Sequence, residues 1–373
     1  MPTSRRDFLT RGGLLAAGAT LATPALANAS PEIRWTMTSA FSPSLDAIYG
    51  GAQTFATAVA GMTDQRFIID IEPAGAIVSA VNALEAVAEG KAHCAHTMLS
   101  YSWTKEPAYF FASGAPFGMN ARQHAAWLRV GGGNELLDAL LAERGLIAMP
   151  LGGTGGQMAG WFRKEMRASA DLAGMKVRIG GFAGKVLETR GATAISLPKE
   201  KILAALAEGS LDAFEWIGPY DDEKFASADG ANAPISALAP YYYYPGWWKG
   251  DTQLHLIVSK EKFAALPKAY QAALRSAAAL ADDGVRARYD AANPAALKRL
   301  VVGGAQLRLF PQEVLEVCYQ ATNDLYSELS RQDAKFKAVA DSYLSFRSDE
   351  YLWWQVAEYS FDNFMIHERR ARR

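Results

Sequence analysis

Cysteine is scarce in this chain of 373 residues, which has Cys94 and Cys318 and no others. The two lie far apart in the apolar contexts AHCAHT and EVCYQA, so we expect buried thiols rather than a disulfide. No CxxC pair and no GxxxxGKS/T motif is present, which argues against a cysteine metal cluster and a phosphate-binding loop. Of the five histidines, only His93 and His96 are closely spaced, and a strand would point their side chains to opposite faces. A zinc site is therefore not expected.

An excess of charge of either sign is also missing. The chain has 38 Lys and Arg residues against 39 Asp and Glu residues, a formal net charge of −1. A near-neutral chain gives no electrostatic reason to expect nucleic acid or an anionic membrane surface as a partner. We therefore expect no nucleic-acid partner.

Long hydrophobic runs are absent too, because no stretch approaches the roughly 20 apolar residues of a membrane-spanning helix. The apolar run at 14–26 is short and rich in Gly, Ala and Thr. It follows the basic segment SRRDFL (4–9) and ends in ALA (25–27), the pattern of a twin-arginine signal peptide with its cleavage site. We interpret residues 1–27 as this signal and predict a mature protein that begins near Asn28 in the periplasm.

Segments with strand-like alternation and segments with helical spacing follow one another through most of the chain. Strand patterns include EIRWTMTS (32–39), RFIIDIEPAG (66–75) and TQLHLIVS (252–259), whereas the sequence after Pro267 is mostly helical. The roughly 346 residues after the signal exceed what one hydrophobic core usually serves. We predict an α/β protein with a two-lobed periplasmic-binding-protein (venus flytrap) fold and a long helical C-terminal part.

The predicted lobes are not simple consecutive halves of the chain. Lobe 1 is expected at roughly 31–152 and lobe 2 at roughly 153–244. Residues 245–373 contribute to both lobes and supply a C-terminal helix.

Arg178 is the first candidate for a binding residue. Lys176 and Arg178 stand two apart in a predicted strand and so share a face, and Arg178 precedes a Gly-Gly turn. A guanidinium there suits bidentate capture of a carboxylate. The alternative is a strand face whose two cations meet solvent.

Glu215 lies in the stretch DAFEWIGPYDDEKF (212–225), which we expect to begin with a strand at 212–216. Flanking aromatics make Glu215 a ligand for a hard cation or a general acid with a raised pKa. Asp221 and Asp222 follow a Gly-Pro-Tyr turn and are interpreted as the solvated first turn of a helix.

Two further segments provide neutral candidates. In GGTGGQMAGWF (152–162), Gln157 follows a glycine-rich turn and is either a cation ligand or a solvated loop residue. In APYYYYPGWWKGDTQ (239–253), six aromatics crowd around Pro245 and Gly246, which favours a pocket wall or hinge cover over plain core.

The ordered set of motifs resembles the substrate-binding proteins of TRAP (tripartite ATP-independent periplasmic) transporters, in the branch that binds 2-oxo acids or lactate. The resemblance rests on RWTMTSAF, GGQMAGWFRKE, GMKVRIGGFAG, FEWIGPYDDEK, YYYYPGWW and DEYLWWQVAEYSFDNF. Departures at 98–102 (MLSYS), in AISLPKEKI and in the longer segment 225–239 leave the identity of the solute's side chain open.

The resemblance implies a set of site residues. Arg178 would hold the solute carboxylate, and the side chains of Gln157 and Glu215 with the carbonyl oxygen of Trp216 would hold Na⁺ or Ca²⁺. Gln253 is a further predicted metal ligand. Substrate contacts are predicted for Arg178, Gln157, Glu215, Trp216, Tyr101 and Phe182.

The predicted function is a periplasmic solute receptor of a TRAP transporter. It would bind a small 2-oxo or 2-hydroxy monocarboxylate (pyruvate, 2-oxobutyrate or lactate) with the cation and deliver it to the small and large permease subunits. The resemblance also implies a homodimer that exchanges a C-terminal helix, for which 351–366 is the candidate. The alternative is an exported enzyme that uses Glu215 as acid or base, although no Ser/His/Asp elbow supports it. A receptor that serves an ATP-driven importer is a third reading.

Overall fold

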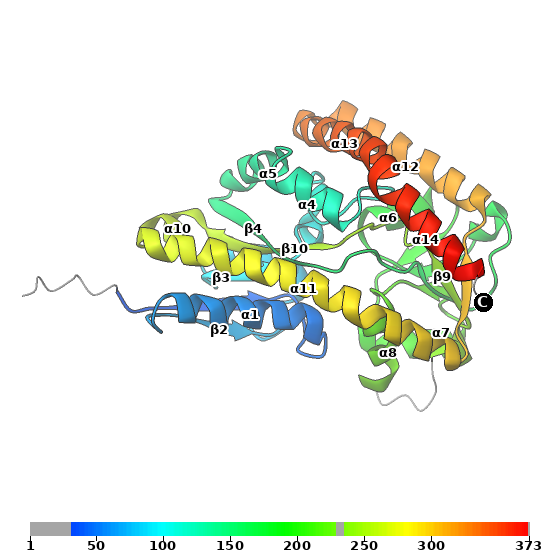
Figure 1. Ribbon diagram of the computed structural model, residues 1–373, viewed down its shortest axis with the longest axis horizontal. Helices are drawn as coiled ribbons and strands as arrows, with labels where there is room; N and C mark the ends of the chain where they lie inside the picture. The colour runs from blue at the N-terminus through cyan, green and yellow to red at the C-terminus, as the bar shows by residue number, and fades with distance from the viewer. Residues whose placement is uncertain (1–30, 229–234, 372–373) are drawn as a thin grey trace, which may run out of the picture. The chain divides into compact units, whose positions relative to one another are not determined.

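The computed structural model describes residues 31–228 and 235–371 (Figure 1). The described residues from Ile33 onward form one compact unit. The predicted signal peptide (1–27) and its cleavage site lie outside the described residues, as does the centre of the segment 225–239. In the described part of the chain, no helix combines the length and apolarity needed to cross a bilayer.

The first sheet has five strands in the order β2-β1-β3-β10-β4. These are β2 (Phe67–Glu72), β1 (Ile33–Ser39), β3 (Cys94–Thr97), β10 (Gln253–Ser259) and β4 (Leu146–Gly153). The first three are parallel, and β10 runs antiparallel to both β3 and β4. Because β10 is covered on both faces, its sequence QLHLIVS is buried at six of seven positions.

The second sheet has six short strands in the order β11-β9-β5-β8-β6-β7. They are β11 (Gln306–Leu309), β9 (Tyr241–Tyr244), β5 (Gly160–Phe162), β8 (Ala213–Phe214), β6 (Lys176–Arg178) and β7 (Thr193–Ile195). The chain leaves the first sheet after β4, builds most of the second, returns for β10 and contributes β11 last. Two sheets with covering helices confirm the predicted two-lobed α/β class.

The helices pack around these sheets (Figure 1). The longest, α11 (Lys268–Val302), contacts α1 and β4 of the first sheet's part of the molecule and also α8, which follows β8 of the second sheet. The other α-helices are α1 (Asp46–Met62), α2 (Ala83–Ala88), α3 (Tyr109–Ala112), α4 (Ala121–Arg129), α5 (Gly133–Ala142), α6 (Gly181–Glu188), α7 (Lys199–Glu208), α8 (Pro219–Ala228), α9 (Ile235–Leu238), α10 (Lys260–Ala265), α12 (Gln312–Gln332), α13 (Ala334–Trp354) and α14 (Ser360–Ala371). Short 3₁₀ turns lie at Ala80–Asn82, Leu99–Ser102 and Ser169–Leu172, and a π-helical turn at Gln355–Tyr359 joins α13 to α14.

A buried carboxylate holds the point where β4 and β10 meet α11. Asp282 Oδ1 accepts hydrogen bonds from the backbone N–H of Gly152 (2.9 Å) and from Gln253 Nε2 (2.7 Å). Its Oδ2 forms ion pairs with Arg286 and Arg129. The pKa of Asp282 is lowered, because these partners outweigh the effect of burial. This network ties α11 to the strand ends from which the chain crosses to the second sheet.

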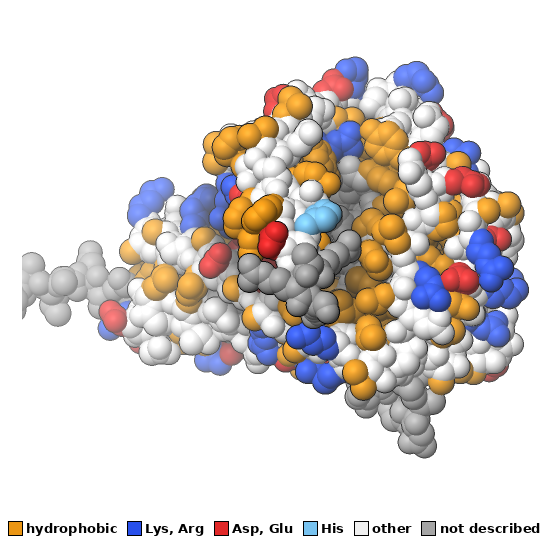
Figure 2. All heavy atoms as spheres, turned by 45° about the vertical axis from the view of Figure 1, so that its right-hand side comes forward, with side chains coloured by type: hydrophobic (Ala, Val, Ile, Leu, Met, Phe, Trp, Pro, Cys, Tyr) orange, Lys and Arg blue, Asp and Glu red, His pale blue; other side chains and the backbone are white. Residues whose placement is uncertain are grey.

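The C-terminal segment keeps large hydrophobic side chains exposed. Between 49% and 70% of the surface remains accessible at Tyr351, Leu352, Trp353, Val356, Tyr359, Phe361, Phe364, Met365 and Ile366. We call these residues the C-terminal apolar face. Figure 2 brings the right-hand side of Figure 1 forward and shows hydrophobic side chains gathered on this side of the molecule. Cys94 and Cys318, in contrast, are buried free thiols, which confirms the prediction made for them.

Candidate functional site

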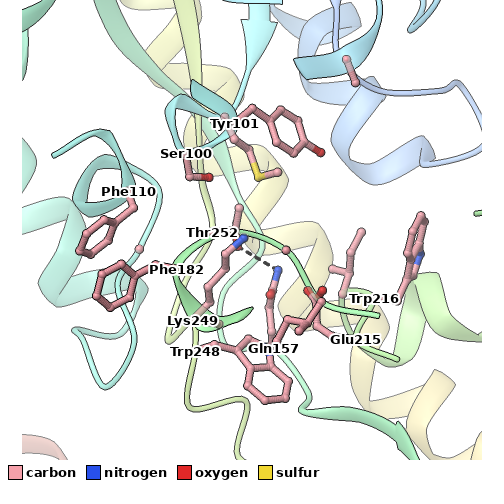
Figure 3. Close-up of a pocket in the computed structure, with 18 of the residues that line it drawn as sticks. Ser100, Tyr101, Phe110, Gln157, Phe182, Glu215, Trp216, Trp248, Lys249 and Thr252 are labelled. Atoms are coloured by element: carbon pink, nitrogen blue, oxygen red, sulfur yellow. Dashed lines mark hydrogen bonds between the residues drawn. The ribbon is translucent and has the colours of Figure 1, made fainter. Parts of the chain in front are cut away.

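A cavity of about 690 Å³ is lined by segments that belong to both sheets. From the first sheet's side come residues of 41–48, 79–81, 98–103 and 110–116; from the second sheet's side come residues of 178–183, 196–198 and 215–217. Figure 3 shows ten labelled lining residues around this space. Much of the lining is apolar or aromatic, with a small number of polar groups, the composition of a small-molecule site.

Arg178 enters the cavity because of the strand register. It is the last residue of β6 and lies opposite Phe214 of β8, so that the next residue, Glu215, donates its backbone N–H to Arg178 O (3.0 Å). The guanidinium donates through Nη1 to the Glu215 carbonyl oxygen (2.8 Å) and to Glu215 Oε2 (3.3 Å). Its carbon also lies 5.3 Å from the centroid of the Trp216 ring, at cation–π distance. Lys176, at the start of the same strand, is exposed and does not line the cavity.

Glu215 is a nearly buried carboxylate, with 13% of its side chain exposed. Burial raises its pKa, although the charges of Arg178 and Lys249 act in the opposite direction. The strand before it is shorter than predicted, because β8 ends at Phe214. Phe214 and Trp216 nevertheless both pack against the ring of Phe225, at centroid distances of 5.3 and 5.1 Å. Glu215 therefore stands between an aromatic cluster and the cavity.

Gln157 presents an oxygen without a partner. Its Nε2 donates to Thr154 Oγ1 (3.2 Å) and Thr252 Oγ1 (3.0 Å), which fixes the orientation of the amide. Figure 3 shows Gln157 beside Thr252. Its Oε1 is buried and has no hydrogen-bond donor among the described residues. A buried acceptor is costly unless a donor or a cation satisfies it. The unpartnered Gln157 oxygen is therefore a suitable ligand for a cation at this end of the cavity.

The donor set also indicates which kind of cation fits. The described residues contain no group of three or more Asp, Glu, His or Cys side chains arranged to hold a metal. Gln157 and Trp216 can instead offer an amide and a carbonyl oxygen beside the Glu215 carboxylate. Neutral oxygens with a single carboxylate suit hard cations such as Na⁺ and Ca²⁺ and do not suit zinc.

Tyr101 and Phe182, for which the resemblance implies substrate contacts, also line the cavity. Burial raises the pKa of the Tyr101 hydroxyl to about 12, so it stays protonated at neutral pH. The ring of Phe182 stacks on Phe110 with centroids 4.4 Å apart. Aromatic side chains thus form part of the cavity wall.

Gln253 has a different place from the one predicted. It does not line the cavity, and its amide Nε2 donates to Gly152 O (2.7 Å), Leu254 O (2.9 Å) and Asp282 Oδ1 (2.7 Å). Its Oε1 accepts from Arg286. With its oxygen engaged in the buried Asp282 network, Gln253 is a structural residue, and we do not retain it among the cation ligands.

Asp221 and Asp222 correct a second expectation. They do lie in the first turn of a helix, α8, but neither is solvated: each is 1% exposed. Tyr289 OH donates to Asp221 Oδ2 (2.5 Å). Trp161 Nε1 and Tyr242 OH donate to Asp222 Oδ2 (3.0 and 2.8 Å), and the Ile217 N–H donates to its Oδ1 (3.2 Å). Spacing alone did not show the aromatic donors that other elements bring to these carboxylates.

Asp222→Ala is therefore expected to lower the free energy of unfolding by about 2–4 kcal/mol, because three buried donors lose their acceptor. Burial raises the pKa of Asp222 from 3.8 to about 7, so the folded protein holds a proton that the unfolded chain releases. The contribution of Asp222 is then greatest below pH 4 and is lost as the pH rises through about 7. Urea titrations at pH 5 and pH 8 should show a larger deficit at pH 5.

The matched control is Glu223→Gln, which removes an exposed ion pair with Arg299 and should cost about 1 kcal/mol or less. If both substitutions lower the free energy of unfolding by the same small amount, Asp222 is better described as a solvated helix cap.

Lys249 is a site residue that sequence reasoning did not select. It follows Trp248 in the segment between β9 and β10 and lines the cavity with Glu215 and Gln157 (Figure 3). Burial lowers the pKa of Lys249, and Glu215 acts against this effect. The sequence feature that could have identified Lys249 is its position as a single cation in an aromatic segment, next to Gly250.

The family model described as bacterial extracellular solute-binding protein, family 7, matches residues 38–333. A curated relative, the monocarboxylate 2-oxoacid-binding periplasmic protein of Nostoc sp., is 38% identical over 366 residues. The match covers 96% of this chain and 98% of the relative.

Solved structures of TRAP solute-binding proteins are also similar to this chain. A TRAP solute-binding protein of Bordetella bronchiseptica, described as a mixed-occupancy dimer with calcium and picolinate in one site, is 39% identical. It has a TM-score of 0.86, and the match covers 92% of this chain and 100% of that one. Two TRAP proteins are each 30% identical, with 89% of this chain and 99% of theirs covered. The Colwellia psychrerythraea protein holds calcium and pyruvate (TM-score 0.84), and the Pseudoalteromonas atlantica protein holds sodium and pyruvate (TM-score 0.83).

Proposed function

Because this chain belongs to the solute-binding proteins of TRAP transporters, we propose that it captures a small 2-oxo or 2-hydroxy monocarboxylate together with Na⁺ or Ca²⁺. It would then deliver the acid to the small and large subunits of a TRAP permease. Proteins of this family are periplasmic. The observation that carries the proposal is the meeting of Arg178, Glu215 and the unpartnered Gln157 oxygen in one cavity.

Each residue has a role that its surroundings support. Arg178 supplies a planar pair of N–H donors for the carboxylate of the acid. Gln157, Glu215 and the carbonyl oxygen of Trp216 would hold the cation, which when bound neutralises the acid and fixes its 2-oxygen. Tyr101 and Phe182 would contact the remainder of the solute. The relatives that hold pyruvate or picolinate with calcium or sodium support this choice of ligand.

An exported enzyme that uses Glu215 as acid or base has less support. The described residues that line the cavity include no His, Cys or Asp that could act with Glu215 in proton transfer or nucleophilic attack. Incubation with pyruvate, 2-oxobutyrate or lactate should leave each acid chemically unchanged. Product formation would favour the enzyme.

A thermal-shift screen tests the proposal. Ligands that bind the folded state raise the melting temperature by mass action. Pyruvate, 2-oxobutyrate and lactate should raise it most when Na⁺ or Ca²⁺ is present, and dicarboxylic acids should raise it less. A panel in which none of these monocarboxylates shifts the melting temperature with either cation would contradict the proposal.

Delivery and export complete the proposal. Capture would close lobe 1 (about 31–152) on lobe 2 (about 153–244) around the cavity by a hinge motion. The twin-arginine signal at 1–27 would carry the folded protein to the periplasm. Replacing Arg5 and Arg6 with Lys should then strand the precursor in the cytoplasm, and an unchanged periplasmic yield would contradict this route.

We further propose a homodimer formed by exchange of the C-terminal helix. The C-terminal apolar face exposes more large hydrophobic surface than an isolated terminal helix should leave to water. The start of this segment is anchored, since Tyr351 OH donates to Gly118 O (3.1 Å) and Arg122 contacts both Glu358 and the Trp354 ring. Light scattering of the intact protein should give the mass of a dimer, and deletion after residue 345 should abolish it. A monomer mass for the intact protein would refute the proposal.

A further inference from the structure

Lys249 is held in place by the backbone on both sides. Gly246 donates its N–H to Gln157 O (3.1 Å), and a Cβ built at Gly246 would lie 2.5 Å from that same oxygen. A Cβ at Gly250 would lie 2.5 Å from Met119 O. The N–H of Lys249 donates to Gly246 O (3.0 Å), and the preceding Trp248 is 3% exposed. This close packing fixes the backbone of Lys249 next to the Gln157 loop. The Cα position of Lys249, from which its side chain extends, is therefore well defined.

The charges of the cavity are unequal. Among the described residues that line it, Arg178 and Lys249 are the cations and Glu215 is the carboxylate. Glu215 is already within ion-pair distance of Arg178 (3.3 Å). The described part of the chain places no carboxylate within ion-pair distance of the Lys249 ammonium. Two cations and one carboxylate leave the lining with one net positive charge, which already balances a monocarboxylate.

An inorganic cation would enter this same region. The Gln157 oxygen and the Glu215 carboxylate are the acceptors there, and an ammonium can satisfy both as well as a metal ion can. A like charge nearby disfavours the binding of a cation, strongly so where water is excluded. The Lys249 ammonium, which lines the same cavity, is such a like charge for a cation bound by Glu215 and Gln157.

We propose that the positive charge of Lys249 competes with the inorganic cation for the field of Glu215, and so weakens cation binding at the Glu215 and Gln157 end of the cavity. Lys249 is thus a specificity residue that sets how strongly capture of the acid depends on the cation. This inference rests on the proposed function, since it concerns the same acid and the same cation. It predicts a receptor that binds its acid measurably without added metal and gains modestly when metal is supplied.

The test compares the wild-type protein with Lys249→Met, Lys249→Arg and the surface control Lys91→Met, which lies in an exposed pair with Glu89. Calorimetric titration with CaCl₂ and NaCl alone should show tighter cation binding in Lys249→Met by about tenfold, the effect of about 1.4 kcal/mol. Pyruvate titrations with and without Ca²⁺ should show a larger gain from the cation in Lys249→Met than in the wild type. Lys91→Met should resemble the wild type, and Lys249→Arg, which keeps the charge, should not show the gain in cation affinity expected for Lys249→Met.

The outcomes separate the two proposals. If pyruvate and its analogues do not bind the wild type under any condition, the proposed function fails. If pyruvate binds but cation affinity and cation dependence are the same in wild type and Lys249→Met, competition by Lys249 is refuted. Equal shifts in Lys249→Met and Lys249→Arg, with their melting temperatures unchanged, would also refute it, because the side chain's shape rather than its charge would be responsible.

Discussion

Replacing Asp282 with alanine is expected to lower the free energy of unfolding by about 3–5 kcal/mol. The side chain is fully buried, and its carboxylate serves two arginines, one amide side chain and one backbone N–H. Removal would leave Arg286, whose side chain is 16% exposed, as a buried charge without its main partner. Breaking a buried pair from one side costs more than the pair contributes, because the remaining charge cannot return to water.

Equilibrium urea unfolding measures this effect, and Asp341→Ala provides the control. Asp341 pairs with Lys337 on the exposed face of α13, so its loss should cost about 1 kcal/mol or less. Because the pKa of Asp282 is lowered, its contribution should be present above pH 4 and fall as the carboxylate is protonated in acid. A cost near that of Asp341→Ala would show that the network does not hold β4, β10 and α11 together.

The second large effect is on binding. Arg178→Lys keeps the positive charge but loses the planar pair of donors, so affinity for pyruvate should fall by roughly 10- to 100-fold. The same change should not alter the melting temperature of the free protein by more than a few degrees, since Arg178 is partly exposed to the cavity.

Lys176→Ala is the matched control, because Lys176 lies in the same strand and points its charge outside the cavity lining. Calorimetric titration should give it wild-type affinity. If Arg178→Lys binds pyruvate as tightly as the wild type, the alternative of a solvated strand cation becomes the better description of Arg178.

Some of this architecture could be read from the sequence because it depends on local patterns. Alternation in EIRWTMTS and QLHLIVS gave β1 and β10, and the Gly-Gly turn after Arg178 marked the end of β6. The prediction that Arg178, Glu215, Gln157, Trp216, Tyr101 and Phe182 share one site followed from the family resemblance, since no spacing in the sequence brings the four segments that carry them together.

What could not be predicted depends on contacts between distant segments. The sequence predicts Asp222 as a solvated helix cap, whereas in the structure it accepts hydrogen bonds from Trp161 of β5 and Tyr242 of β9. Gln253 was predicted as a metal ligand, whereas Asp282 and Arg286 of α11 engage its amide group. Lys249 was not selected from the sequence, because its place in the cavity depends on the close packing of Gly246 and Gly250 against distant backbone. In the first two cases the partners are at least 20 residues away in the chain, and in the third the backbone packing decides.

The central claim is that one cavity binds a 2-oxo acid and a cation together, with Glu215 as the charged ligand of the cation. The most direct measurement is calorimetric titration of wild type and Glu215→Gln with pyruvate, at zero and at saturating Ca²⁺. Since coupling between sites is reciprocal, Ca²⁺ should tighten pyruvate binding in the wild type, and pyruvate should tighten Ca²⁺ binding by the same factor. In Glu215→Gln that factor should approach one and affinity for pyruvate should fall. Equal coupling in both proteins, or wild-type binding of pyruvate by Glu215→Gln, would contradict the account.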